Sequence, residues 1–263
     1  MNKIVKFFLW GIFIWWIVTF MIFIFISDIP ELAMELRSSD KYIPAIFYVV
    51  MSIFAFFMMT RMIKKAREQK KVMSEILFGF FLLSAVSGFI QGFFGILQFT
   101  VSVLQNFWTS STYFFVTGST FMLGFFVIEL FFKGLNTKKN KVALITIGIV
   151  ILISNLGISL NILTDLGDIY LYVPIVLLLI STLGLYGALI YQSFKISRFL
   201  DPSPEKSSLI YIGLSGFFLI IGFILVIVYS FTDLNIIRIT NAIIFMIGYF
   251  LLYWGFTLPS RKT

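Results

Sequence analysis

Charged residues divide this chain into long apolar segments, and this division constrains the fold more than any other feature. A helix needs about 20 mostly apolar residues to cross a bilayer. Eight segments of that size are present, and the few charges within them lie near segment ends. The sequence therefore predicts an all-α integral membrane protein, a single polytopic domain over residues 1–263 with about eight transmembrane helices. The predicted spans are 7–26, 42–63, 72–97, 113–132, 142–163, 171–191, 209–230 and 239–258.

The polar connectors separate these spans and set their orientation. Lys and Arg accumulate in short cytoplasmic loops, and 17 of the 20 basic residues fall on one side of the predicted topology. The other side carries only Arg37, Lys41 and Arg238. We therefore expect a cell-membrane protein with both termini in the cytoplasm, which requires an even number of spans. A polar run from Gln98 to Thr112 predicts the connector between the third and fourth spans.

Composition excludes several classes of function. The chain contains no Cys and no His, so disulfides, thiol chemistry, His-based catalytic triads and most zinc or haem sites are ruled out. No P-loop, Rossmann glycine pattern or G-x-S-x-G motif occurs. We expect no catalytic, cofactor-binding or metal-binding residues, and we expect that the protein is not an enzyme.

Two carboxylates are the charged candidates for a functional site. Glu75 and Glu129 lie within about one turn of the predicted cytoplasmic surface, each four residues from a lysine. One interpretation is an ordinary interfacial pair whose side chains reach the surface. The alternative is a cytoplasmic vestibule shared by consecutive spans.

Small and amide residues within the spans are the candidates for helix packing or for lining a cavity. Ser84, Gly88 and Gly92 recur every four residues, the small-xxx-small pattern that lets two helices approach closely. Gln91 and Asn155, like Asn161 and Asn241, are amides within or at the edges of spans. A hydrogen bond between helices is the favoured role for such amides, ahead of contact with a ligand.

The two halves of the chain share several short motifs. Phe121–Gly124 matches Phe245–Gly248, and Gly79 and Gly88 align with Gly213 and Gly222. The pattern predicts two four-helix units, 1–132 and 141–258, repeated in parallel about an axis along the membrane normal. Chance agreement in an alphabet rich in Phe, Ile, Leu and Gly is the alternative.

Three functional classes fit these features. The first is a non-catalytic sensor, receptor-like or accessory membrane protein that acts through its basic cytoplasmic loops and a separate cytoplasmic signalling partner. The second is a small-solute permease without ion coupling, since charge is absent from the middle of the spans. The third is a carboxylate-dependent membrane enzyme. The basic loops predict contact with anionic lipid headgroups rather than with nucleic acid.

Overall fold

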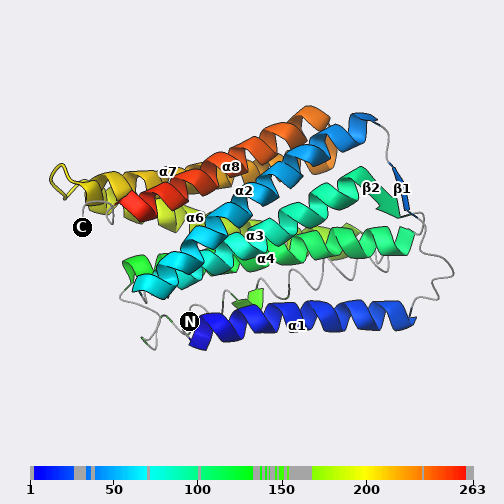
Figure 1. Cartoon of the computed structure of the whole chain (residues 1–263), viewed down its shortest axis with the longest axis horizontal. Coiled ribbons are helices and arrows are strands. Elements are labelled where there is room, and N and C mark those ends of the chain that lie inside the picture. The colour runs from blue at the N-terminus through cyan, green and yellow to red at the C-terminus, as the bar shows by residue number, and fades with distance from the viewer. Residues whose placement is uncertain are drawn as a thin grey trace. The chain divides into compact units, whose positions relative to one another are not determined.

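A computed structural model gives the structure of this chain, and its helices are shown in Figure 1. The described helices are α1 (Lys3–Ile26), α2 (Ser39–Gln69), α3 (Val72–Ile96), α4 (Ser102–Phe131), α6 (Asp168–Ser197), α7 (Pro204–Thr232) and α8 (Asn235–Thr257). Two short strands, β1 (Met34–Leu36) and β2 (Leu97–Phe99), form an antiparallel pair that ties the connector after α1 to the end of α3. The structure describes residues 3–26, 34–36, 39–69, 72–99, 102–132, 168–232 and 234–258, with 137, 140, 142, 146, 148–150 and 153.

Six helices are long and apolar enough to cross a membrane. They are Tyr42–Glu68, Val72–Ile96, Ser111–Phe131, Val176–Ser197, Pro204–Val226 and Asn235–Thr257. These helices agree with a helical membrane protein, and they lie at the positions of six of the eight predicted spans. The first predicted span lies within α1, whereas most of the predicted span 142–163 lies outside the described residues.

The fourth span differs from its prediction at its start. The polar run was expected to be a connector up to Thr112, but α4 already begins at Ser102. Ser111 Oγ donates to the Phe107 carbonyl at 2.9 Å, and Thr112 Oγ1 donates to the Trp108 carbonyl at 3.2 Å. Hydroxyls that bond to a carbonyl four residues back remain satisfied within a helix. Polarity alone therefore did not end this helix.

Backbone contacts divide the chain into two compact units, residues 1–179 and 180–263, with the division inside α6. In the first unit, α3 packs against both α2 and α4. Ala45 of α2 lies against Gly95, and Ser52 Oγ donates to the Ala85 carbonyl at 2.7 Å. As the α2 residue number rises, the number of its α3 partner falls, so α2 and α3 are antiparallel.

The α3–α4 pair is also antiparallel. Gly79 at the beginning of α3 contacts Met122 in the second half of α4, and Ser87 Oγ donates to the Thr112 carbonyl at 3.4 Å. These two helices are the most buried, with 67% and 72% of their apolar windows inside the protein against 33–39% for the other four. They form the core of the first unit.

Helix α1 packs along α4 through aromatic rings. Phe8 lies 4.5 Å from Phe121 between ring centroids, and Phe13 lies 5.6 Å from Phe115. The order of these contacts makes α1 antiparallel to α4. The four helices therefore alternate in direction along the chain, as consecutive membrane spans with short connectors do.

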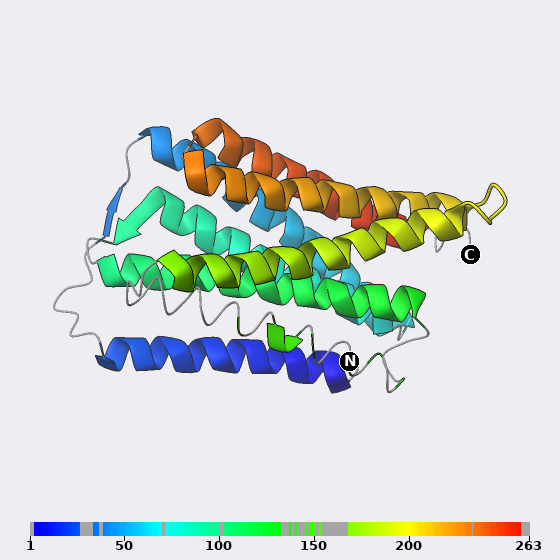
Figure 2. The same ribbon diagram turned by 180° about the vertical axis from the view of Figure 1, so that it is seen from behind.

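The second unit is built on a regular α7–α8 pair (Figure 2). A methyl group placed at Gly248 would lie 3.0 Å from Leu219 Cδ2, and one placed at Gly255 would lie 2.9 Å from Ile212 Cγ1. Small or short polar residues recur every seven positions on the facing sides of both helices, whereas Gly213 and Gly216 of α7 lie against α6. A seven-residue repeat keeps one seam facing the partner helix, as in a coiled coil. The small residues are Ser208, Ser215 and Gly222 on α7 and Asn241, Gly248 and Gly255 on α8.

The predicted duplication of 1–132 and 141–258 is not tested by these contacts and stays a prediction. The order of neighbours agrees, since α3 packs on α2 and α4 while α7 packs on α6 and α8. The matched glycines face different neighbours, because Gly88 lies against α2 whereas Gly222 lies against Phe245 of α8.

Candidate functional site at the basic end of the first unit

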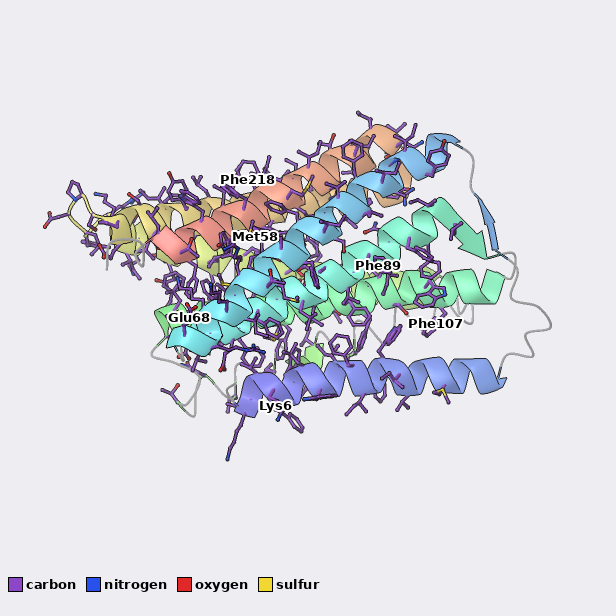
Figure 3. The ribbon with its side chains drawn as sticks, viewed as in Figure 1. Lys6, Met58, Glu68, Phe89, Phe107 and Phe218 are labelled. Atoms are coloured by element: carbon purple, nitrogen blue, oxygen red, sulfur yellow. The ribbon has the colours of Figure 1, made fainter. Side chains whose placement is uncertain are left out.

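Basic side chains gather where α1 begins and α2 ends. The alternating helix directions place these two helix termini at the same end of the first unit. Figure 3 shows Lys6 and Glu68 at this end and Phe107 toward the opposite end. We call this region the basic end. Its described basic residues are Lys3, Lys6, Arg61, Lys64, Lys65 and Arg67.

Most of this positive charge faces outward. The Arg61 guanidinium lies 5.0 Å from the Phe57 ring centroid, a cation–π contact that leaves its charge unneutralised. Lys64 Nζ approaches Glu68 Oε1 at 4.0 Å, but these side chains are 72% and 59% exposed. An exposed pair at this distance contributes about 0–1 kcal/mol to stability. The positive charges of Arg61 and Lys64 are therefore largely exposed.

The two candidate carboxylates also lie at this end. Glu75 is in the first turn of α3 and Glu129 is in the last turn of α4, and both are half-buried. The antiparallel register of α3 and α4 places them at the same level of the bundle. Next to Glu75, Ser74 is fully buried, and its hydroxyl has no hydrogen-bond partner among the described residues. The vestibule that these residues were expected to line stays a prediction.

Gly88 and Gly92 of α3 face α2. A methyl group at Gly88 would lie 2.8 Å from Met51 Cε, and one at Gly92 would lie 2.8 Å from the Val49 backbone nitrogen. Ser84 is buried on the same helix, and its hydroxyl has no hydrogen-bond partner in the described part of the chain. At Gly88 and Gly92, the missing side chain allows close approach of two helices.

The amide side chains have different surroundings. Asn241 is buried in α8, and its Nδ2 donates to the Gly222 carbonyl of α7 at 2.5 Å. This bond confirms for Asn241 the interhelical role that the sequence favoured. Gln91 is half-buried on α3, whereas Asn155 and Asn161 lie outside the described residues.

An aromatic cluster at the other end of the first unit joins three helices. Trp16 of α1 donates from Nε1 to Ser111 Oγ at 2.9 Å, and its ring lies 6.1 Å from Trp108. Trp108 stacks on Phe94 of α3 at 4.2 Å. A polar tryptophan in the middle of an apolar helix thus has a hydroxyl partner on its neighbour.

Sequence inspection missed two packing features. One is Ser52, whose hydroxyl joins α2 to α3 from inside the apolar interface. The other is the seven-residue repeat of small residues on α7 and α8. This second signal is visible in the sequence, because the glycines and serines recur at fixed intervals.

In the described part of the chain, no group of three or more His, Cys, Asp and Glu side chains is arranged to hold a metal ion. Comparison with known proteins found no matching family model, no matching curated protein and no matching solved structure.

Proposed function

We propose that this protein is a non-catalytic sensor-like or accessory protein of the cell membrane that acts through its basic end. The observation that carries the proposal is the convergence of exposed basic side chains from α1 and α2 at one end of the first unit. The apolar helices anchor the chain in the bilayer, and the basic end contacts anionic headgroups and a separate cytoplasmic signalling partner.

Electrostatics favours this interpretation of the basic end. A basic residue near an anionic leaflet contributes about 1 kcal/mol to surface attraction, within a Debye length of the headgroups. Arg61, Lys64 and Arg67 are all exposed at the end of α2. Among the described side chains, the charged ones of α2 lie from Arg61 to its end, whereas Glu75 lies in the first turn of α3 and Glu129 in the last turn of α4. That distribution does not favour a coupled ion pathway through the core of the first unit.

The proposed topology has eight spans with both termini in the cytoplasm. It is supported by the unequal distribution of basic residues and by the alternating directions of α1–α4. A duplication of 1–132 and 141–258 belongs to the same proposal and is supported by the matched motifs and the shared order of neighbours. Superposition of the two halves in an experimental structure tests the duplication.

Thermal unfolding in mixed micelles tests the role of the basic end. We expect phosphatidylglycerol to raise the melting temperature more than phosphatidylcholine does. A triple variant with Lys64→Gln, Lys65→Gln and Arg67→Gln should lose most of that difference. A control with Lys64→Arg, Lys65→Arg and Arg67→Lys keeps the charge and should retain it. Equal lipid responses in wild type and both variants would contradict the proposal.

Solute flux distinguishes the proposed role from a permease. Proteoliposomes should shrink and re-swell in glycerol, urea or small sugars at the rate of protein-free liposomes. Re-swelling that is faster in the presence of the protein would replace the sensor-like role with facilitated diffusion.

A further inference from the structure

The connector between α6 and α7 is short and internally bonded. The Phe199 backbone nitrogen donates to the Ile196 carbonyl at 3.1 Å, and Lys206 Nζ donates to the Leu200 carbonyl at 3.0 Å. At the start of α7, Ser203 Oγ accepts a hydrogen bond from the Lys206 backbone nitrogen at 3.2 Å. This N-cap fixes the beginning of α7. These hydrogen bonds, and not only the shortness of the connector, therefore hold it in one conformation.

This conformation directs one aromatic ring outward. Phe199 is 83% exposed, although it lies in a tight connector. Lys195 lies four residues before Phe199 and Arg198 lies directly before it, and both basic side chains are exposed. Lys195 Nζ also lies 5.5 Å from the Tyr191 ring centroid. The tip of the α6–α7 hairpin thus combines an apolar ring with basic side chains.

The far end of this unit has a similar aromatic and basic pair. The Arg238 guanidinium at the start of α8 lies 4.6 Å from the Tyr229 ring centroid near the end of α7. Tyrosine and arginine at helix ends are typical of the membrane–water interface. We infer that Tyr229 and Arg238 lie at the level of one membrane–water interface.

Counting along the helices places the connector at the other interface. About 20 helical residues cross the hydrocarbon core, so the second boundary on α7 lies near residue 209. On the same helix, a methyl group at Gly213 would lie 3.1 Å from the Phe194 ring of α6. Since α6 and α7 are antiparallel, the residue of α6 level with 209 is Arg198. Phe199 then lies at the boundary between headgroups and acyl chains.

We propose that the α6–α7 connector is a membrane-surface anchor for an anionic leaflet. Phe199 inserts its ring at the level of the headgroup–acyl boundary, and Lys195 and Arg198 bind lipid phosphates. An interfacial aromatic ring beside basic side chains gains from apolar burial and from electrostatic attraction together. The proposed topology places this connector at the cytoplasmic leaflet, and the inference rests on the proposed function for that assignment.

Spin labelling tests the anchor directly, because the chain has no cysteine of its own. Single variants Phe199→Cys, Asp201→Cys and Phe217→Cys are labelled with a nitroxide in nanodiscs containing phosphatidylglycerol. Asp201 is exposed two residues further along the connector, and Phe217 is 51% exposed in the middle of α7. Power saturation compares collisions with oxygen, which enters the bilayer, and with a water-soluble nickel chelate.

We expect the oxygen-to-nickel collision ratio to be highest at 217, intermediate at 199 and several-fold lower at 201. In the Phe199→Cys background, Arg198→Gln should make the label shallower in phosphatidylglycerol and leave it unchanged in phosphatidylcholine. Equal ratios at 199 and 201 with a high ratio at 217 would overturn the anchor and assign Phe199 to a surface for a soluble protein. A low ratio at 217 would instead contradict the membrane-spanning role of α7, and with it the proposed function.

Discussion

The side-chain amide of Asn241 in α8 is hydrogen-bonded to the backbone carbonyl of Gly222 in α7. Gly222 has no side chain to separate the helices, so a short polar side chain on α8 reaches the α7 backbone. Gly222 and Asn241 both belong to the seven-residue repeat that joins α7 and α8. The polar bond and the close packing are therefore two consequences of one helix contact.

Replacing Asn241 with Leu keeps the approximate volume and removes the donor. Polar contacts between membrane helices contribute about 0.6–1.7 kcal/mol, so we expect a destabilisation of about 1 kcal/mol. Thermal unfolding in detergent measures this change. The control is Thr240→Val, on the exposed side of α8, where the hydroxyl bonds only to the Ile236 carbonyl of its own helix. If both variants melt together, the Asn241 bond is not a stabilising contact.

Replacing Gly92 with Ala tests the close approach of α2 and α3. The added methyl group would lie 2.8 Å from the Val49 nitrogen and 3.0 Å from the Ala45 carbonyl oxygen, and backbone atoms cannot rotate away. Overpacking of this kind costs about 1–3 kcal/mol. We expect a lower melting temperature in detergent.

The matched control for Gly92 is Gly11→Ala on α1, where an added methyl group would have no atom within 4 Å. There the gain in helix propensity, about 0.5–1 kcal/mol in water-soluble helices, should leave stability unchanged or raised. A lower melting temperature for Gly11→Ala than for Gly92→Ala would contradict the packing described for α3.

Trp16 and Trp15 are adjacent in α1 but have different surroundings. Trp16 donates to Ser111 Oγ, whereas the Trp15 side chain is 46% exposed. We expect Trp16→Phe to cost about 1 kcal/mol through the lost hydrogen bond, and Trp15→Phe to be close to neutral. Thermal unfolding in detergent measures both effects. Equal stability of the two variants would show that the hydrogen bond from Trp16 to Ser111 does not stabilise the packing of α1 on α4.

Cysteine labelling tests the topology, including the span outside the described residues. In intact cells, an impermeant thiol reagent should modify Ser39→Cys and Leu234→Cys and should leave Thr137→Cys and Asp201→Cys unmodified. Asp201 is exposed in the α6–α7 connector and does not cap α7. Labelling of Thr137→Cys would contradict the proposed orientation. Labelling of Asp201→Cys together with protection of Leu234→Cys, with Ser39→Cys still labelled and Thr137→Cys still protected, would mean that 142–163 does not cross the membrane.

The sequence by itself determined the approximate positions of the membrane-spanning segments along the chain. In lipid, the backbone N–H and C=O groups must form their hydrogen bonds within the helix. The side chains of a membrane-spanning helix are therefore mostly apolar all around the helix. Six spans could therefore be located from residue counts and charge positions without knowing any contact. The two candidate carboxylates were likewise placed near one end of the spans before their neighbours were known.

The tertiary structure decided which side of each helix meets another. A helix that is apolar all round carries little information about its buried face, so the sequence did not predict Ser52 at the α2–α3 interface or Trp16 against Ser111. It also did not predict that the polar residues after Ser102 continue α4 as a helix. Neighbouring helices supplied what the sequence lacked, because packing distance and hydrogen-bond partners in a membrane depend on the facing helix rather than on hydrophobicity.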